Sequence, residues 1–237
     1  MKKQKVTFSW SGGKDSALAL YKLLQSDEYE VVSLHTSFDK ELKRVGMHGI
    51  PEALIDQQAA SIGLPLEKLY LAKGTSHEEY EKMIKAFCMG QREKGVEVFG
   101  YGDIFLQDLK EYREKQLETV DLKAVFPLWK IPTKNIVEEF LSLGFNTILC
   151  CLNAEMLPKA VLGKPFGSVK EEINKLVDPC GENGEFHTFV YEGPIFKAPI
   201  QFSLGRQLLK TYDLKKEESG KIVKLKHEYW FQEVLSE

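Results

Sequence analysis

The chain has 237 residues, of which 43% are hydrophobic, so it has enough apolar material for one large or two small packed cores. Its 32 basic and 35 acidic side chains give a formal net charge of −3, which excludes an overall basic field and leaves nucleic acid without support as a partner. Because no stretch approaches the ~18 uncharged apolar residues of a membrane span, a cytoplasmic protein without a membrane partner is expected.

The first half of the chain alternates short β-prone runs with helical stretches. Strands are predicted at 6–10, 31–35, 66–71, 96–99 and 124–126. Helices are predicted at 17–24, 51–62, 76–94 and 109–119, the second of them opened by Pro51 and closed by Gly63. Strands separated by helices of this length predict βαβ units, and hence a parallel sheet covered on both faces.

The second half has a different character. A helix at 134–143 and an apolar strand at 147–152 are followed by frequent glycine and proline from Pro158 onward. Segment 178–185 is predicted as a loop, the charged run 215–218 as a solvated turn, and strands are predicted at 186–191, 200–204 and 222–231. We therefore expect two domains, 1–128 and 129–237, the second being a smaller α+β unit.

The strongest functional motif is Ser11-Gly12-Gly13-Lys14-Asp15-Ser16, between the first predicted strand and the first helix. Backbone N–H groups at a helix N-terminus are unpaired and bind anions, and glycines let the backbone approach a ligand closely. The lysine adds a positive charge at a junction expected to be exposed, the serines offer hydroxyls, and Asp15 can help to hold Mg²⁺. A capped glycine turn would contain similar residues, but six consecutive residues of phosphate-binding type at this junction favour a phosphate site.

The motif differs from Walker A, because Asp15 follows Gly13-Lys14. It resembles the loop of the PP-loop ATP pyrophosphatases. Further motifs narrow this resemblance to the diphthine-ammonia ligase family, also described as the ATP-binding diphthamide-synthesis domain, from Val6 to roughly Phe196. These motifs are Gly102-Asp103-Ile104, Pro127-Leu128-Trp129, Gly181-Glu182-Asn183-Gly184-Glu185-Phe186-His187-Thr188 and Gly193-Pro194-Ile195-Phe196.

The resemblance implies an adenine nucleotide alpha hydrolase-like fold, with a parallel sheet covered by helices on both faces and a smaller C-terminal α+β domain. It also implies an ATP-dependent carbon-nitrogen ligase that uses ATP and Mg²⁺ and releases AMP and pyrophosphate. In that family, ammonia amidates the carboxylate of diphthine, a modified histidine on elongation factor 2. If this chain is bacterial, its acceptor must be a different carboxylate.

Two predicted site residues lie at the ends of other strands. Asp103, next to Gly102, follows the fourth predicted strand, and His48 follows the second. Ligands of parallel sheets bind at the carboxyl ends of the strands, so these residues are assigned to the nucleotide together with the loop. A turn aspartate and an ordinary loop histidine are the alternatives.

The long motif of the second half is assigned to the acceptor and ammonia. Glu182, Asn183 and Gly184 are predicted on the substrate side. Glu185 and His187 are predicted catalytic residues beside Lys14 and Asp15, because ammonium must lose a proton before it attacks and either group can accept it. A surface hairpin would show similar residues.

Two other functions fit parts of the sequence. One is a PP-loop enzyme that modifies tRNA, either a thiolase or a lysidine-type ligase. The four cysteines form no C-x-x-C pair, which argues against a thiolase, and the acidic net charge weakens both forms. The other is a sensor that binds ATP or AMP without turnover, for which the polar motif at 178–187 would be surplus.

Overall fold

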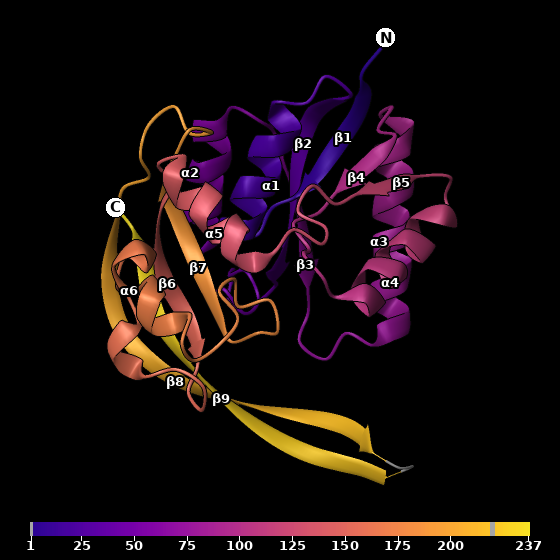
Figure 1. Ribbon diagram of the computed structural model, residues 1–237. Coiled ribbons are helices and arrows are strands. Elements are labelled where there is room, and N and C mark those ends of the chain that lie inside the picture. Colours follow the sequence, from indigo (N-terminus) through magenta and orange to yellow (C-terminus); the bar gives the residue numbers. More distant parts are fainter. Residues whose placement is uncertain (1, 219–220) are drawn as a thin grey trace.

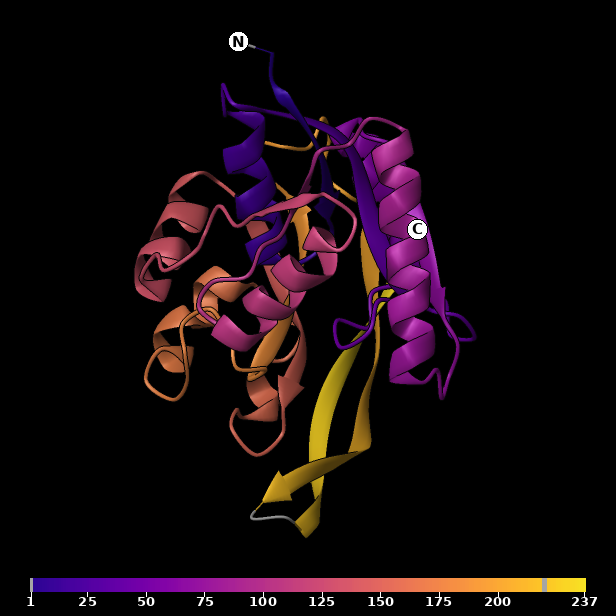
Figure 2. The same ribbon diagram turned by 90° about the vertical axis from the view of Figure 1, so that its right-hand side faces the viewer.

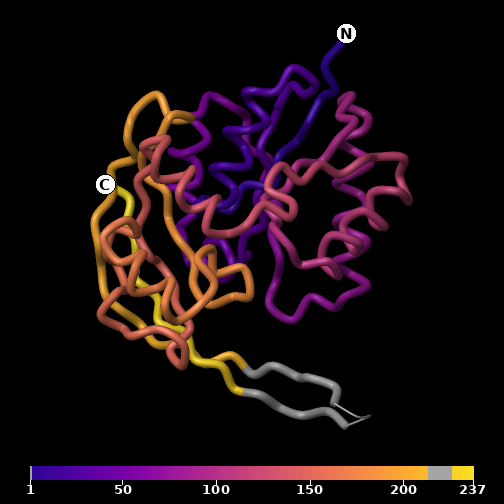
Figure 3. Tube along the Cα trace, viewed as in Figure 1, coloured from indigo at the N-terminus to yellow at the C-terminus, as the bar shows by residue number. Residues whose placement is uncertain are grey.

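The computed structural model describes the backbone of residues 2–218 and 221–237 and the side chains of 2–212 and 226–237 (Figures 1 and 3). The first half of the chain forms a five-stranded parallel sheet with the order β3-β2-β1-β4-β5. Its strands are β1 Gln4–Ser9, β2 Tyr29–Asp39, β3 Leu66–Leu71, β4 Val98–Gly100 and β5 Lys123–Val125. The predicted parallel sheet is confirmed.

Helices cover both faces of this sheet. α1 Lys14–Leu24 and α2 Glu52–Ile62 lie on one face, and α3 His77–Glu93 and α4 Gln107–Glu118 lie on the other (Figures 1 and 2). Gly63 ends α2 with a φ of 86°, as a left-handed residue after a helix should. Of the residues of α4, only Leu117 is buried. No helix in the described part of the chain is both long and apolar enough to cross a bilayer.

The second half forms a four-stranded antiparallel sheet with the order β7-β6-β9-β8. Its strands are β6 Asn146–Asn153, β7 Phe186–Glu192, β8 Phe202–Glu218 and β9 Lys221–Ser236. The helices of this half are α5 Thr133–Ser142, the 3-10 turn η1 Lys159–Val161 and α6 Phe166–Ile173. A C-terminal α+β region is thus present as expected. The domain boundary at 128/129, between β5 and α5, stays a prediction.

In this half one helix was missed and one local prediction was wrong. α6 was not predicted, although Phe166, Val169 and Ile173 are buried at the spacing of one helix face. The run 215–218 belongs to β8, not to a turn, because β8 continues in register with β9 as far as Glu218. At its base the β8–β9 hairpin joins the sheet through β9, which pairs with β6 from Cys151 to Asn153 (Figure 1).

One apolar core joins the two sheets on the side of α1 and α2, and it includes Phe8 of β1 and Phe189 of β7. A second cluster around Phe99 lies under α3 and α4. Polar contacts tie β7 to the loop after β1. The Val190 N–H donates to the carbonyl of Gly12 at 2.9 Å.

Gln58, which is fully buried, reinforces this seam. Its amide nitrogen donates to the carbonyls of Val190 at 2.6 Å and Gly12 at 3.3 Å, and its amide oxygen accepts from Trp10 at 2.9 Å. The C-terminal sheet is therefore fixed directly to the predicted phosphate loop.

Candidate active site

The predicted phosphate loop connects β1 to α1 and is shaped by its glycines. Gly12 has a φ of 80°, and a Cβ there would lie 2.7 Å from the Ile55 side chain, so both conformation and space require glycine. Gly13 precedes the helix and offers no side-chain cap. The Ser11 hydroxyl accepts from the Gly13 N–H at 3.3 Å and donates to the Ser16 hydroxyl at 3.0 Å. The loop is thus held in one conformation at the helix N-terminus.

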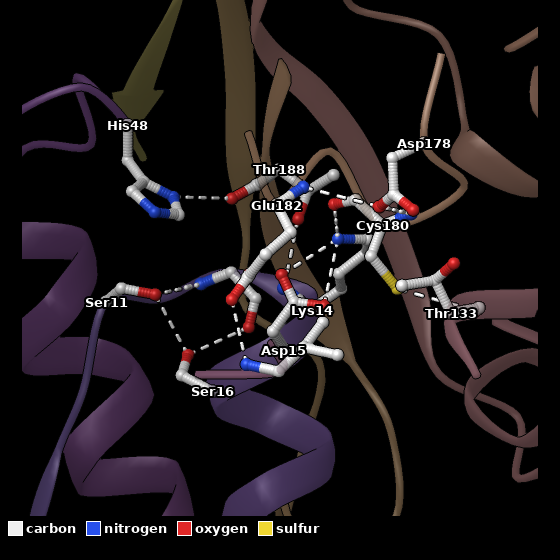
Figure 4. Close-up of polar contacts among 12 residues, drawn as sticks. Ser11, Lys14, Asp15, Ser16, His48, Thr133, Asp178, Cys180, Glu182 and Thr188 are labelled. Atoms are coloured by element: carbon white, nitrogen blue, oxygen red, sulfur yellow. Dashed lines mark hydrogen bonds and ion pairs between the residues drawn. The ribbon is translucent and has the colours of Figure 1, made fainter. Parts of the chain in front are cut away.

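Lys14 is buried, with 3% of its surface exposed, so the expectation of an exposed lysine was wrong. Its ammonium contacts both carboxylate oxygens of Asp15, at 2.9 and 2.8 Å, and donates to the carbonyl of Cys180 (Figure 4). Segment 178–188 of the second half covers it. Burial is the largest single effect and opposes the charge, but Asp15, Cys180 and Glu182 together outweigh it and raise the pKa of Lys14. The lysine therefore stays protonated.

A cavity of about 300 Å³ opens beside this loop, where β1 and β4 end. It brings together most of the predicted site residues. From the loop it is lined by Ser11, Lys14, Asp15 and Ser16. From later segments it is lined by His48, Gly102, Asp103, Glu182 and His187. A larger cavity of about 380 Å³ lies between α3 and α4, but none of the predicted site residues lines it.

Three predicted residues of the second half lie outside the cavity lining. Glu185 is buried, with 3% exposed, and its carboxylate accepts a hydrogen bond of 3.0 Å from the amide of Asn183. Asn183 is itself exposed, and Gly184 is half-buried. These three residues shape the turn before β7 and do not face the loop's ligand space.

Gly102 fits tightly against the start of α1. A Cβ at this position would lie 3.1 Å from both the carbonyl carbon of Asp15 and the nitrogen of Ser16. Because those atoms belong to the backbone, they cannot move aside as a flexible side chain can. Glycine here lets the connection after β4 approach the start of α1 closely and line the cavity beside it.

Glu182 links the second half of the chain to the same connection. Its carboxylate accepts a hydrogen bond of 2.8 Å from the Ile104 N–H. Burial, together with the carboxylates of Asp15 and Asp103, raises the pKa of Glu182 to about 7, against the opposing effect of this hydrogen bond and of Lys14. The charge of Glu182 therefore changes near neutral pH.

Two histidines face each other in the cavity, His48 from the connection between β2 and α2 and His187 from β7. Their ring centroids lie 4.6 Å apart. Burial lowers the pKa of His48 to about 4, and burial with the nearby His48 and Lys14 lowers the pKa of His187 well below its ordinary value. Both rings are therefore neutral at neutral pH.

Residues 4–124 match the family model of the diphthamide synthase N-terminal domain, and residues 132–220 match that of the diphthamide synthase C-terminal domain. The chain belongs to the diphthamide synthase family. Curated relatives named diphthine-ammonia ligase include one from Danio rerio, 26% identical over 217 residues that cover 80% of this chain and 83% of the relative. Another, from Schizosaccharomyces pombe, is 27% identical over 216 residues, covering 80% of this chain and 34% of the relative.

Membership of the diphthamide synthase family confirms the predicted resemblance and the enzyme class, an ATP-dependent carbon-nitrogen ligase. Among solved structures, the U34-tRNA thiolase NcsA from Methanococcus maripaludis is 19% identical with a TM-score of 0.37, covering 60% of this chain and 57% of that one. That similarity is too weak to bear on function. The four cysteines of this chain are buried and form no disulfide.

Sequence reasoning missed several residues that line the cavity in this member of the diphthamide synthase family. Arg113 of α4 forms an ion pair of 2.8 Å with Asp103, and its guanidinium lies 4.2 Å from the ring centroid of Tyr101. Leu106 and Leu109 add an apolar surface. Tyr101 follows β4 directly, a position that could have identified it, whereas an arginine inside a polar helix gave no signal.

Without a bound nucleotide, the residues of this site provide few ligands for Mg²⁺. Among the described residues, no group of three or more histidine, cysteine, aspartate or glutamate side chains is arranged to hold a metal ion. Asp15 is the only carboxylate of the loop itself, and both of its oxygens accept hydrogen bonds from Lys14. Mg²⁺ commonly takes one or two carboxylates and completes its shell with phosphate oxygens and water. Asp15 therefore fits as one ligand of a nucleotide-bound Mg²⁺.

Proposed function

We propose that this protein is a diphthine-ammonia ligase, which cleaves ATP to AMP and pyrophosphate and converts the carboxylate of diphthine on elongation factor 2 into an amide. One observation carries the proposal. A single cavity joins the phosphate loop of the first sheet to Glu182 and His187 of the second half of the chain. The name diphthine-ammonia ligase, given to the relatives, supports diphthine as the acceptor and ammonia as the nitrogen source.

In this proposal, ATP lies with its phosphates at the start of α1. The first N–H groups of a helix lack helical partners and carry partial positive charge, and Lys14 adds a full charge beside them. The adenine base occupies the opposite wall, where Tyr101, Leu106 and Leu109 present an aromatic ring and apolar surface. Asp15 would hold Mg²⁺ with the phosphates, and the ion would neutralise phosphate charge when bound.

The chemistry proceeds in two steps. The acceptor carboxylate attacks the α-phosphorus, the bond to the β-phosphate oxygen breaks, and pyrophosphate leaves. Ammonia then attacks the acyl carbon of the mixed anhydride, and AMP leaves with the electron pair of the broken C–O bond. The tasks of the protein are positioning and charge stabilisation, which Lys14 and the helix N-terminus are placed to provide.

The cavity also revises the predicted division of labour. The groups proposed for nucleotide and for ammonia line one space rather than two separate sites. Of the two predicted general bases, His187 lines this space, whereas Glu185 is buried behind it against Asn183. We therefore keep His187 on the ammonia side of the reaction and assign Glu185 to the support of the turn before β7.

The test is reconstitution with elongation factor 2 that carries diphthine, ATP, Mg²⁺ and isotopically labelled ammonium. We expect AMP and pyrophosphate in equal amounts to a labelled amide, measured by chromatography and mass spectrometry. Elongation factor 2 with an unmodified histidine is the control and should yield no amide. ADP and phosphate as main products would overturn the proposal, and bound ATP without any turnover would favour the sensor.

A further inference from the structure

We infer that His48 and His187 together form the binding site for ammonia, and that Nε2 of His48 takes the proton that the nitrogen loses as the amide forms. This inference rests on the proposed amidation. It assigns His48 to ammonia, the nucleophile, whereas sequence reasoning assigned this residue to the nucleotide. It also gives Thr188, which sequence reasoning left without a role, the task of positioning His48.

The two histidines stand directly against the phosphate loop. A Cβ on Gly13 would lie 2.6 Å from Cε1 of His48, so the imidazole packs on the loop backbone itself. His187 faces it with a ring-centroid distance of 4.6 Å, and both side chains line the cavity. A small molecule held by these rings is therefore adjacent to the place where the α-phosphate and the acyl group react.

Thr188 fixes which nitrogen of His48 carries the proton. Nδ1 lies 3.1 Å from the Thr188 carbonyl oxygen (Figure 4). Because a carbonyl oxygen only accepts hydrogen bonds, Nδ1 must donate, and the neutral ring then presents a lone pair at Nε2. Within the described part of the chain, neither this Nε2 nor a ring nitrogen of His187 has a hydrogen-bonding partner in the protein. The cavity thus contains basic lone pairs that no protein group uses.

The charges around the pair favour ammonia over ammonium. Both rings are neutral, and the ammonium of Lys14 lowers the pKa of each, so its field opposes a second cation. Burial and the Lys14 charge both disfavour ammonium, whereas the lone pairs of the two rings can still accept the N–H groups of neutral ammonia, whose own lone pair stays free to attack. The site therefore selects the form of the nitrogen that can attack.

The proton balance of the second step is simple. The ammonia lone pair forms the C–N bond, and the C–O bond to AMP breaks with its electrons going to AMP. Once bonded to the acyl carbon, the nitrogen is a much stronger acid than ammonium, so a weakly basic imidazole suffices to take its proton. The proton passes to Nε2 of His48 and then to water, which restores the neutral ring.

The test compares ammonium with hydroxylamine, which is mostly unprotonated at neutral pH. Once bonded to the acyl carbon, its nitrogen is also more acidic than that from ammonia, so hydroxylamine depends less on a site that selects the free base and less on a group that takes the proton. In His48→Asn the amide nitrogen can replace Nδ1 and keep the bond to Thr188, but nothing replaces Nε2. In His48→Gln the amide group reaches the position of Nε2. In His187→Phe the facing ring remains without its nitrogens. His77→Asn, at an exposed histidine of α3, is the matched control.

For His48→Asn and His187→Phe we expect kcat/KM for ammonium to fall about 10²-fold, the usual scale for a lost acid-base group, with the KM for ATP unchanged. With hydroxylamine, the fall in hydroxamate formation should be less than about tenfold. His48→Gln should recover part of the ammonium activity, and His77→Asn should match the wild type.

Equal losses with both nucleophiles, or a raised KM for ATP with an unchanged KM for ammonium, would overturn the inference and return His48 to the nucleotide. Wild-type protein that makes neither amide nor hydroxamate would instead overturn the proposed function, and the inference with it. Thermal melting of each variant shows whether a loss comes from misfolding. If one histidine variant misfolds, the nucleophile comparison on the others still decides.

Discussion

The main-chain N–H of Lys14 donates a hydrogen bond of 2.9 Å to the hydroxyl of Thr188, a residue 174 positions later in the chain. Lys14 is the first residue of α1, and Thr188 lies in β7 of the antiparallel sheet. A side-chain oxygen normally caps a helix from the residue just before it, but Gly13 has none. The second half of the molecule thus supplies the cap of the helix that begins at the phosphate loop.

Replacement of Thr188 by valine should destabilise the protein by about 0.5–2 kcal/mol, the usual cost of a lost helix cap. The Thr188→Ser variant keeps the hydroxyl and should stay close to the wild type. Urea unfolding at constant pH measures both free energies. If the valine and serine variants proved equally stable, the hydroxyl would not act as a cap.

The Lys14→Met variant keeps the length and apolar stem of the side chain but removes its charge. Loss of a preorganised electrostatic contact typically lowers the rate of turnover ~10²–10³-fold, so AMP formation should fall by that amount. Because Lys14 is buried against Asp15, stability should fall as well. Lys134→Met, at a side chain that is 75% exposed, is the control and should change neither. Undiminished AMP formation by Lys14→Met would contradict a phosphate-binding role and show that the loop is only a structural turn.

A methyl group at Gly102 should weaken nucleotide binding. It would approach the backbone of Asp15 and Ser16 to 3.1 Å, so the connection after β4 must shift away from α1 and distort the cavity. Gly90 in α3 has open space around it, and Gly90→Ala should leave binding unchanged and stabilise the helix by roughly 0.5–1 kcal/mol. Calorimetric titration with a non-hydrolysable ATP analogue compares the two. Equal affinities would contradict the close approach.

Stability should depend on pH through Glu182. Its pKa rises from an ordinary 4.5 to about 7 in the folded state, so folding favours the protonated form, and that stabilisation is lost as the pH rises from about 4.5 through 7. In Glu182→Gln this loss is absent. The variant should therefore gain stability relative to the wild type between pH 5 and pH 8, by on the order of 1–2 kcal/mol after allowance for partial solvent screening. Urea unfolding of both proteins at the two pH values measures the gain, and a pH-independent difference would contradict the raised pKa.

Local patterns were sufficient to predict the first sheet. The predicted strand at 66–71 coincides with β3, and the helix ended by Gly63 coincides with α2. They were not sufficient for the long hairpin, because β8 is an edge strand whose stability comes from main-chain pairing with β9 and not from alternating burial. Main-chain pairing without alternating burial leaves no side-chain periodicity from which a strand can be predicted.

For the site, the sequence identified the loop and the ends of the strands but not the environment of either. The burial of Lys14 depends on the carbonyl of Cys180, which lies 166 residues away. The ion pair between Arg113 and Asp103 depends on how α4 docks on the sheet. Spacing along the chain contains no information on such contacts, since they arise only when separately formed elements pack together.

The buried amide of Gln58 affects the route by which a nucleotide can enter and leave the cavity. Parting the two sheets at this seam would leave its N–H groups and the carbonyls of Gly12 and Val190 without partners, at about 1–3 kcal/mol for each buried group. Across the cavity, Leu117 is the only buried residue of α4, and the helix contributes the Arg113 ion pair with Asp103. In the proposed reaction we therefore expect ATP to enter, and AMP to depart, past α4, while the seam at Gln58 stays closed.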